Sequence, residues 1–201
     1  MFRQMIDTDH DRWYASALLC LIICLIKLNV YGQSTSVLEK KLLHIDDDST
    51  QIVLLNELAF SLHNAYPAQT LERSRQVIQQ LDQSPGWLET QRIIAYKNIG
   101  LAFWRLAEYD SSLMYQQMAM RLASDVGNDS LAAKITSNSA LVYKEKGQYA
   151  ASLESSFEAY SAFVAINDWS NQAIVSNNIG VVYKLMKTIR RPLNTSLNLL
   201  K

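Results

Sequence analysis

Hydrophobic and polar positions recur along this chain with two nested periods. Three seven-residue segments share one pattern of polar, small and aromatic residues, and they begin forty residues apart. Together with the residue before it, each segment has small or apolar side chains at positions i, i+3, i+4 and i+7, which share one face of a helix. The pattern therefore predicts one such helix per forty-residue unit, over Lys97–Phe103, Ser137–Tyr143 and Asn177–Tyr183.

A second set of matching positions predicts a second helix in each unit. Glu108–Tyr109 corresponds to Gln148–Tyr149 forty residues later. Gly127 and Asn167 stand at corresponding places between units, where a helix end and a polar cap are expected, and Gly147 is expected to make the turn within its unit. Paired helices at a fixed period predict an all-α repeat protein.

Small and aromatic residues recur at the same positions of the predicted first helices. A small residue in the helix middle lets a neighbouring helix approach closely, which offsets the cost of about 1 kcal/mol for a glycine in a helix. We expect the aromatic residues to interlock one unit with the next. The small residues are Gly100, Ala140 and Gly180, and the aromatic ones are Phe103, Tyr143 and Tyr183.

An earlier and more divergent unit precedes these three. The acidic run Asp46–Asp48 is predicted to cap its first helix, and a second amphipathic helix is indicated by Leu71–Leu81. At the other end of the chain, Pro192 disfavours helix at Arg191, so the last unit is predicted to be incomplete. The repeat domain is expected at 52–201, in units of about 52–84, 87–127, 128–167 and 168–201, after a linker at 34–51.

These motifs together resemble the tetratricopeptide repeat. The resemblance rests on Asn-Ile-Gly followed by Phe or Tyr in the first helix, on Gly147-Gln148-Tyr149 at the turn, and on Ser-Leu and Ala at fixed offsets. The period is longer than usual and is similar to that of a variant common in bacterial sensory proteins. The resemblance implies a right-handed α-α superhelix of about three and a half helix pairs, a solenoid that binds a protein or peptide.

The N-terminal segment, residues 1–33, has a different character and predicts a hydrophobic helix. Trp13–Ile26 carries no charge; it is shorter than the about 20 residues of a membrane span but fits a signal-peptide core. We predict an export signal cleaved after Gly32. The alternatives are an uncleaved membrane anchor through residues 13–32 and a buried core helix, so the protein is expected to be exported, periplasmic or membrane-anchored.

The charge balance and the lack of catalytic or metal-binding motifs in the sequence argue against several classes of function. Nineteen Lys and Arg residues balance nineteen Asp and Glu residues, which removes the attraction on which non-specific nucleic-acid binding depends. The three histidines, His10, His44 and His63, have no second ligand at metal spacing, and no glycine-rich phosphate loop is present in the sequence. We therefore expect no enzyme activity, no metal or other cofactor, and no nucleic-acid partner.

A row of asparagines suggests where a peptide could bind. An amide both donates and accepts hydrogen bonds, so a line of amides can pair with the backbone of an extended peptide. The resemblance implies that this row and its polar flanks turn toward the concave side, but asparagine is also frequent there for structural reasons. The predicted groove residues are Asn98, Asn138, Asn178, Asn177, Trp104, Lys144 and Lys184, and Asn56 continues the row in the first unit.

Two function classes follow from this combination. The preferred one is a non-enzymatic scaffold, exported or membrane-tethered, that binds a protein or peptide. The alternative is the extracytoplasmic sensor portion of a signal-transduction protein, such as a histidine kinase or a transcriptional regulator, without its output domain. Both rest on the resemblance of the fold.

Overall fold

The computed structural model describes residues 35–45, 47–83 and 88–198, with side chains up to residue 189. The predicted signal or anchor at 1–33 lies outside these residues. The chain divides into two compact units, residues 1–46 and 47–201. In the first, a short helix spans residues 35–42, inside the segment predicted as a linker. Among the described helices, none is both long enough and apolar enough to cross a membrane.

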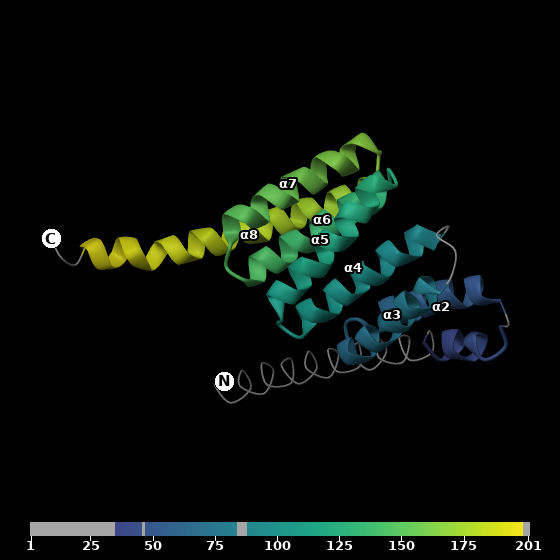
Figure 1. The fold of residues 1–201 in the computed structure, drawn as a ribbon. Helices are drawn as coiled ribbons and strands as arrows, with labels where there is room; N and C mark the ends of the chain where they lie inside the picture. The colour runs from purple at the N-terminus through teal and green to yellow at the C-terminus, as the bar shows by residue number, and fades with distance from the viewer. Residues whose placement is uncertain (1–34, 46, 84–87, 199–201) are drawn as a thin grey trace, which may run out of the picture. The chain divides into compact units, whose positions relative to one another are not determined.

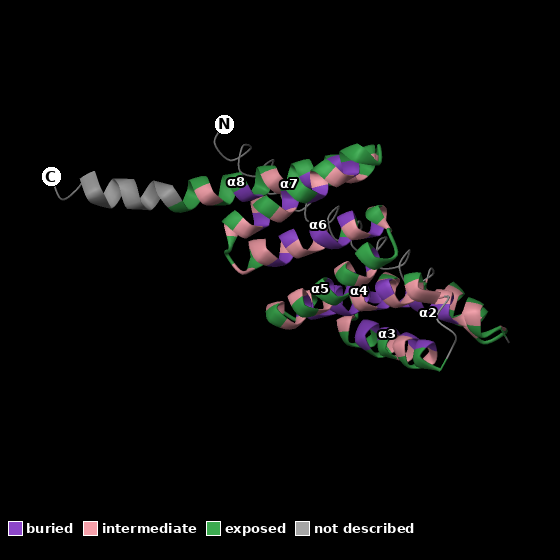
Figure 2. Ribbon diagram, turned by 45° about the horizontal axis from the view of Figure 1, so that its top comes forward, coloured by how far each residue is buried: buried purple, intermediate pink, exposed green. Residues whose placement is uncertain are grey.

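The second unit is built from consecutive helices that pair side by side (Figure 1). This confirms the predicted all-α superhelix of tetratricopeptide-like helix pairs. Figure 2 shows buried residues along the facing sides of the helices and exposed residues at the turns. The helices are α2 (Asp48–Leu62), α3 (Pro67–Asp82), α4 (Glu89–Arg105), α5 (Tyr109–Asp125), α6 (Asp129–Glu145), α7 (Tyr149–Ala165) and α8 (Trp169–Asn198).

The acidic run caps α2, as predicted. Asp47 is the N-cap residue, and its Oδ2 atom accepts hydrogen bonds from the Thr50 amide at 2.8 Å and the Thr50 hydroxyl at 2.5 Å. These bonds hold the pKa of Asp47 below its usual value. The first repeat helix therefore begins at Asp48, a little before the predicted boundary at residue 52.

The four turns between α4 and α8 end the preceding helix with the same hydrogen-bond pattern. In the turn after α4, the amide of Glu108 donates to the carbonyl of Phe103 at 2.9 Å, and the amide of Ala107 donates to Trp104 at 3.0 Å. This pair of backbone hydrogen bonds ends a helix at one residue in the left-handed conformation. Those residues are Ala107 (φ 60°), Gly127 (φ 65°), Gly147 (φ 75°) and Asn167 (φ 55°).

Replacing Ala107 with glycine is expected to stabilise the protein by about 0.5 to 1 kcal/mol. The Cβ of an L-residue is strained at positive φ, and this outweighs the entropy that glycine loses on folding. The matched control is Ala173→Gly, at an exposed position inside α8, where the same change should cost about 1 kcal/mol. Urea denaturation measures both, and a loss of stability in both variants would contradict the expectation.

Hydroxyl groups tie the second helix of each unit to the small residue of the first. The hydroxyl of Ser112 donates to the carbonyl of Gly100 at 2.7 Å, and that of Ser152 donates to Ala140 at 2.8 Å. Thr70 makes the equivalent bond to Ala59 at 3.0 Å in the first unit. The small residues Gly100 and Ala140 thus allow close helix approach, as the sequence predicts. For Gly180 the prediction is wrong, because this residue is exposed and a Cβ there would meet no atom within 4 Å.

Buried apolar clusters join successive units, so the core is a series of local contacts. One cluster links α4, α5 and α6 through Ile93, Ala119 and Ile135. Another links α6, α7 and α8 through Ala133, Phe163 and Val175. Each unit therefore depends mainly on its neighbours for stability.

Two predictions near the end of the chain are corrected. α8 continues through Pro192 to Asn198 instead of breaking near Arg191, although proline removes one helical hydrogen bond. Tyr183 is 52% exposed, whereas Phe103 at the corresponding position is 9% exposed. The difference arises because Phe103 stacks on Tyr115 of α5, with ring centroids 5.5 Å apart, while α8 is the last helix that the structure describes.

Candidate functional site

The predicted groove residues lie on the first helices of the units. These helices, α2, α4, α6 and α8, contact one another in succession. We call the surface that they form the first-helix face. Residues forty apart recur at the same position on it, so a row in the sequence becomes a row in space.

Asn98 is a structural residue rather than a surface one. Its side chain is 0% exposed, and its Nδ2 atom donates to the carbonyl of Asn56 at 3.1 Å. Asn56 in turn donates to the carbonyl and the side-chain oxygen of Gln91 at 2.9 and 3.0 Å. These bonds clamp α2 to α4, so the prediction that Asn98 touches a ligand is wrong and its amide serves the fold.

The later members of the row remain accessible. Asn138 on α6 and Asn178 on α8 are half-buried, and the adjacent Asn177 is exposed. Within the described residues, no hydrogen bond uses their side-chain amides. The amide row available to a ligand is therefore shorter than the sequence predicts and belongs to the third and fourth units.

Trp104, Lys144 and Lys184 occupy corresponding positions but have different surroundings. The guanidinium of Arg105 lies over the ring of Trp104, 4.2 Å from its centroid. Lys144 pairs with the neighbouring Glu145 at 3.1 Å, and Lys184 is exposed. Trp104 is half-buried, so its cation–π partner already covers part of the ring.

The strongest electrostatic feature of the first-helix face is Lys97 on α4. Its Nζ atom lies 4.9 Å from the ring centroid of Phe60 on α2, and that ring stacks on His63, with centroids 4.9 Å apart. Burial, and to a smaller extent the charge of Lys134 on α6, lowers the pKa of Lys97 from 10.5 to about 8. Lys97 is therefore still mostly protonated at neutral pH, in surroundings that disfavour its charge.

Other charges around Lys97 are also positive. Burial lowers the pKa of His63, and the charges of Arg105 and Lys97 lower it further. Among the ion pairs of the described residues, none involves Lys97 or Lys134. Lys97 therefore has no ion-pair partner among the described residues, whereas Lys134 is near enough to Asp168 to help lower the pKa of that carboxyl.

The sequence analysis did not single out Lys97 or Lys134 as candidate binding residues. It also did not identify the contacts that Phe60 and His63 make with Lys97. The forty-residue register does not show contacts between α4 and the divergent first unit. The available signal was that Lys97 replaces the small or amide residues Ser137 and Asn177 at corresponding positions.

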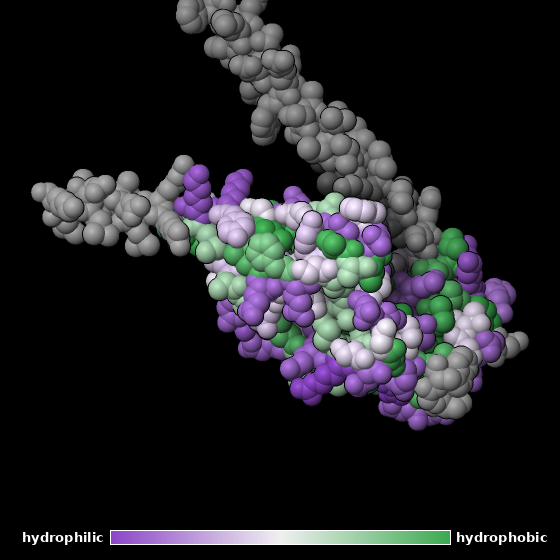
Figure 3. All heavy atoms as spheres, turned by 90° about the horizontal axis from the view of Figure 1, so that it is seen from above, coloured by the Kyte–Doolittle hydropathy of each residue, from purple (hydrophilic) through white to green (hydrophobic). Residues whose placement is uncertain are grey.

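The surface and composition of the site favour binding through mixed contacts. The face of the molecule shown in Figure 3 carries hydrophilic residues between separate groups of hydrophobic ones. Within the described part of the chain, no group of three His, Cys, Asp or Glu side chains is placed to hold a metal ion. What the first-helix face offers is ammonium groups, amides and aromatic rings.

Comparison with known proteins gives structural matches only. No family model matches the chain, and a search of curated proteins found no match. Aspartyl phosphate phosphatase F from Bacillus subtilis matches with a TM-score of 0.67 and 14% identity, over 82% of this chain and 42% of that one. A Rap protein complexed with competence and sporulation factor matches with a TM-score of 0.72 and 13% identity, over 84% and 48% of the two chains.

A third solved structure, BtubC from P. vanneervenii, matches with a TM-score of 0.62 and 16% identity, over 81% of this chain and 66% of that one. The chain spans about half the length of aspartyl phosphate phosphatase F and of the Rap protein. At these identities the matches show a shared fold. The comparisons and the geometry agree on an all-α superhelix of paired helices.

Proposed function

We propose that this chain is a non-enzymatic scaffold that binds a peptide or protein segment carrying a carboxylate on its first-helix face. The observation that carries the proposal is Lys97, an ammonium group in desolvating surroundings that makes no ion pair among the described residues, with Lys134 close to it on the adjacent helix. A ligand carboxylate would offset the cost of keeping Lys97 charged in its desolvated place.

Accessible amides extend this site along the superhelix. Asn138 lies on the same helix as Lys134, one turn further on, and Asn178 follows on α8. Because an amide can pair with any peptide bond, these residues suit a backbone that runs along the face, while the lysines select for acidic groups. Because the chain has a net charge of zero, the electrostatic attraction of an acidic peptide comes from the lysines of this site and not from the protein as a whole.

The fold matches agree with a binding role. One of them was solved as a Rap protein complexed with competence and sporulation factor, and another is named a phosphatase. For this chain we propose binding without chemistry. The sensor portion of a signalling protein remains the alternative, and it would use the same face to bind its signal.

A peptide selection on the full chain tests the proposal. Random peptides displayed on phage are expected to yield binders enriched in Asp, Glu or a free C-terminal carboxylate. Lys97→Met combined with Lys134→Met should weaken the best binder about tenfold or more. The matched control is Lys146→Met, whose charge is already paired with Asp110 at 2.5 Å. Binders that ignore the double variant would contradict the proposal.

The affinity of these peptides is expected to fall as the pH rises through about 8. Below that value Lys97 is already protonated in the free protein, whereas above it binding must also take up a proton. His63, whose pKa is lowered by burial, stays neutral in this range. Titrations between pH 7 and 9 measure the trend, and Lys97→Met should abolish it. A pH-independent affinity would exclude Lys97 from the site.

The N-terminal segment belongs to the same proposal. Its uncharged stretch Trp13–Ile26 and the small Gly32 support export with cleavage before Gln33. Intact-mass measurement of protein recovered from cell envelopes is expected to give a chain that begins at Gln33. A mass that includes residues 1–32 would contradict cleavage and leave the membrane anchor.

A further inference from the structure

The last described helix, α8, exposes the face that the preceding first helices turn toward the second helix of their own unit. On α4 and α6 the second helix donates a serine hydroxyl to the middle of this face, at 2.7 and 2.8 Å. The acceptors are the carbonyls of Gly100 and Ala140. The corresponding Gly180 is exposed, and a Cβ there would meet no neighbouring atom within 4 Å. Among the described residues, no helix therefore covers this face of α8.

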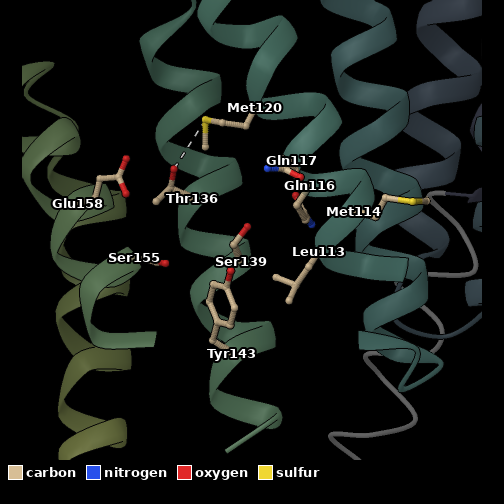
Figure 4. Close-up of a pocket in the computed structure, with 10 residues that line it drawn as sticks. All are labelled: Leu113, Met114, Gln116, Gln117, Met120, Thr136, Ser139, Tyr143, Ser155 and Glu158. Atoms are coloured by element: carbon tan, nitrogen blue, oxygen red, sulfur yellow. Dashed lines mark hydrogen bonds between the residues drawn. The ribbon is translucent and has the colours of Figure 1, made fainter. Parts of the chain in front are cut away.

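Other positions of the face show the same contrast. On α6, Thr136 and Tyr143 lie between the second helices α5 and α7 and line a cavity of about 450 Å³ that is open to solvent (Figure 4). On α8 the corresponding Ser176 and Tyr183 are both exposed. The unpartnered face of α8 thus continues, in the same register, a surface that two earlier units use to bind a second helix.

The forty-residue register identifies the segment that belongs on this face. Because α5 begins at Tyr109 and α7 at Tyr149, residues 189–198 correspond to the first ten residues of a second helix. The leucine at the fifth position of both second helices recurs as Leu193. The chain therefore carries the sequence of the helix that α8 lacks.

The structure places this segment where it cannot cover its own α8. The helices α4 and α6 are followed by a left-handed residue, Ala107 and Gly147 respectively. At the corresponding position Lys187 is helical, and α8 continues without a turn to Asn198. Figure 1 shows this C-terminal part of α8 extending past the end of α7. A helix that continues straight cannot fold back onto itself, so the segment reaches outward.

The outward part of α8 is itself short of contacts. Beyond Val182, which is 1% exposed, the described side chains are exposed except for the half-buried Met186. They include Leu185 at 37% and Ile189 at 50% exposure. A short helical segment without tertiary contacts is marginal in water. A partner that covers both surfaces of α8 would stabilise both.

We infer that two copies of this chain exchange their C-terminal segments, so that residues 189–198 of one copy cover the α8 face around Gly180 of the other copy. The exchange reuses the contact by which α5 covers α4 and α7 covers α6, and a two-fold axis satisfies both copies at once. The exchanged segments are independent of the proposed peptide-binding function.

The register also places the two-fold axis. Ser112 bonds to Gly100, twelve residues before it, so residue 192 of one copy lies opposite Gly180 of the other. Lys187 lies near the midpoint of these positions, and the two copies of this lysine therefore approach each other at the axis. Their repulsion opposes the dimer and is screened by salt.

Sedimentation equilibrium of the full chain measures the dimer. We expect a Kd of about 100 μM at moderate ionic strength, and tighter association at high salt. A chain that stays monomeric at about 500 μM in high salt would overturn the inference.

Lys187→Gly and Lys187→Ala form a matched pair, because both remove the charge at the axis. Glycine favours the left-handed turn found at Gly147, which returns the segment to its own α8, so it should weaken the dimer about tenfold or more. Alanine favours the continuous helix and should tighten the dimer about threefold or more. Changes in the same direction in both variants would overturn the exchange.

Gly180→Leu tests the covered face. The position has open space in a single copy, so the variant should fold, but the added side chain should obstruct the covering helix and weaken the dimer about tenfold or more. Ser161→Leu adds the same side chain at an exposed position on α7 and should leave the Kd unchanged. A Gly180→Leu variant that circular dichroism shows to be folded and that dimerises normally would contradict the inference.

Disulfide trapping distinguishes exchange between copies from a fold-back within one copy. In a Cys20→Ser, Cys24→Ser background, one preparation carries Gly180→Cys and a second carries Pro192→Cys. When mixed and oxidised, the two should form a disulfide-linked pair, since the register places these positions opposite each other. Ser161→Cys mixed with Pro192→Cys is the control and should not link. A mixture of the first two that yields no more linked pair than the control would overturn the exchange.

Discussion

Replacing Phe163 with alanine is expected to lower the free energy of unfolding by about 3 to 5 kcal/mol. Phe163 is 1% exposed and lies on α7 in the cluster that also contains Ala133 of α6 and Val175 of α8. Without the ring, this junction keeps a cavity that its small alanine neighbours cannot fill. Urea denaturation followed by circular dichroism measures the loss.

Two aromatic residues of the first helices provide the comparison. Tyr143 is half-buried and lines the cavity between α5, α6 and α7, and Tyr183 is 52% exposed. Alanine should cost about 1 to 2 kcal/mol at Tyr143 and less than about 0.5 kcal/mol at Tyr183, because less apolar surface leaves a packed environment. Similar losses in all three variants would contradict the burial described here.

The Phe163→Ala variant should also unfold unevenly. In a repeat array each unit contacts only its neighbours, so the loss of one junction weakens the nearby helices first. Hydrogen exchange is expected to show lower protection in α8 and unchanged protection in α3, at the far end of the array. Uniform loss of protection along the chain would indicate a single cooperative core.

The helix pairs could be predicted because their signals are local. Each first helix carries its own apolar spacing, and turn residues such as Gly127 and Gly147 adopt the positive φ that their position requires. The capping carboxylate of Asp47 was likewise readable from the residues around it. The burial of Tyr183 depends on whether another helix packs against it. The repeat pattern does not contain this information, so it predicted the burial of Tyr183 wrongly.

The candidate site was harder to predict than the fold for the same reason. A forty-residue register tells which residues share a face, but it does not tell how closely adjacent helices pack. Lys97 gained its unusual environment from Phe60, a residue of the divergent first unit. The cavity between α5, α6 and α7 was visible only as a change from Tyr96 and Ile99 to smaller residues, which a search for similarity overlooks.

Asn98→Asp is expected to destabilise the protein by about 3 kcal/mol or more. The change keeps the shape of the side chain but replaces the Nδ2 donor, 3.1 Å from the carbonyl of Asn56, with an acceptor. It also buries a negative charge at a position that is 0% exposed. Two acceptors would then face each other at the contact that holds α4 to α2. Thermal and urea unfolding measure the effect.

Asn138→Asp is the matched control, since the two asparagines occupy corresponding positions in successive units. Asn138 is half-buried, and Lys134 lies one turn away on α6, so the same change should stay within about 0.5 kcal/mol. Binding of the selected acidic peptides should fall in this variant, because a new carboxylate would stand beside Lys134. A pair of variants with equal stability would show that Asn98 does not clamp α2 to α4.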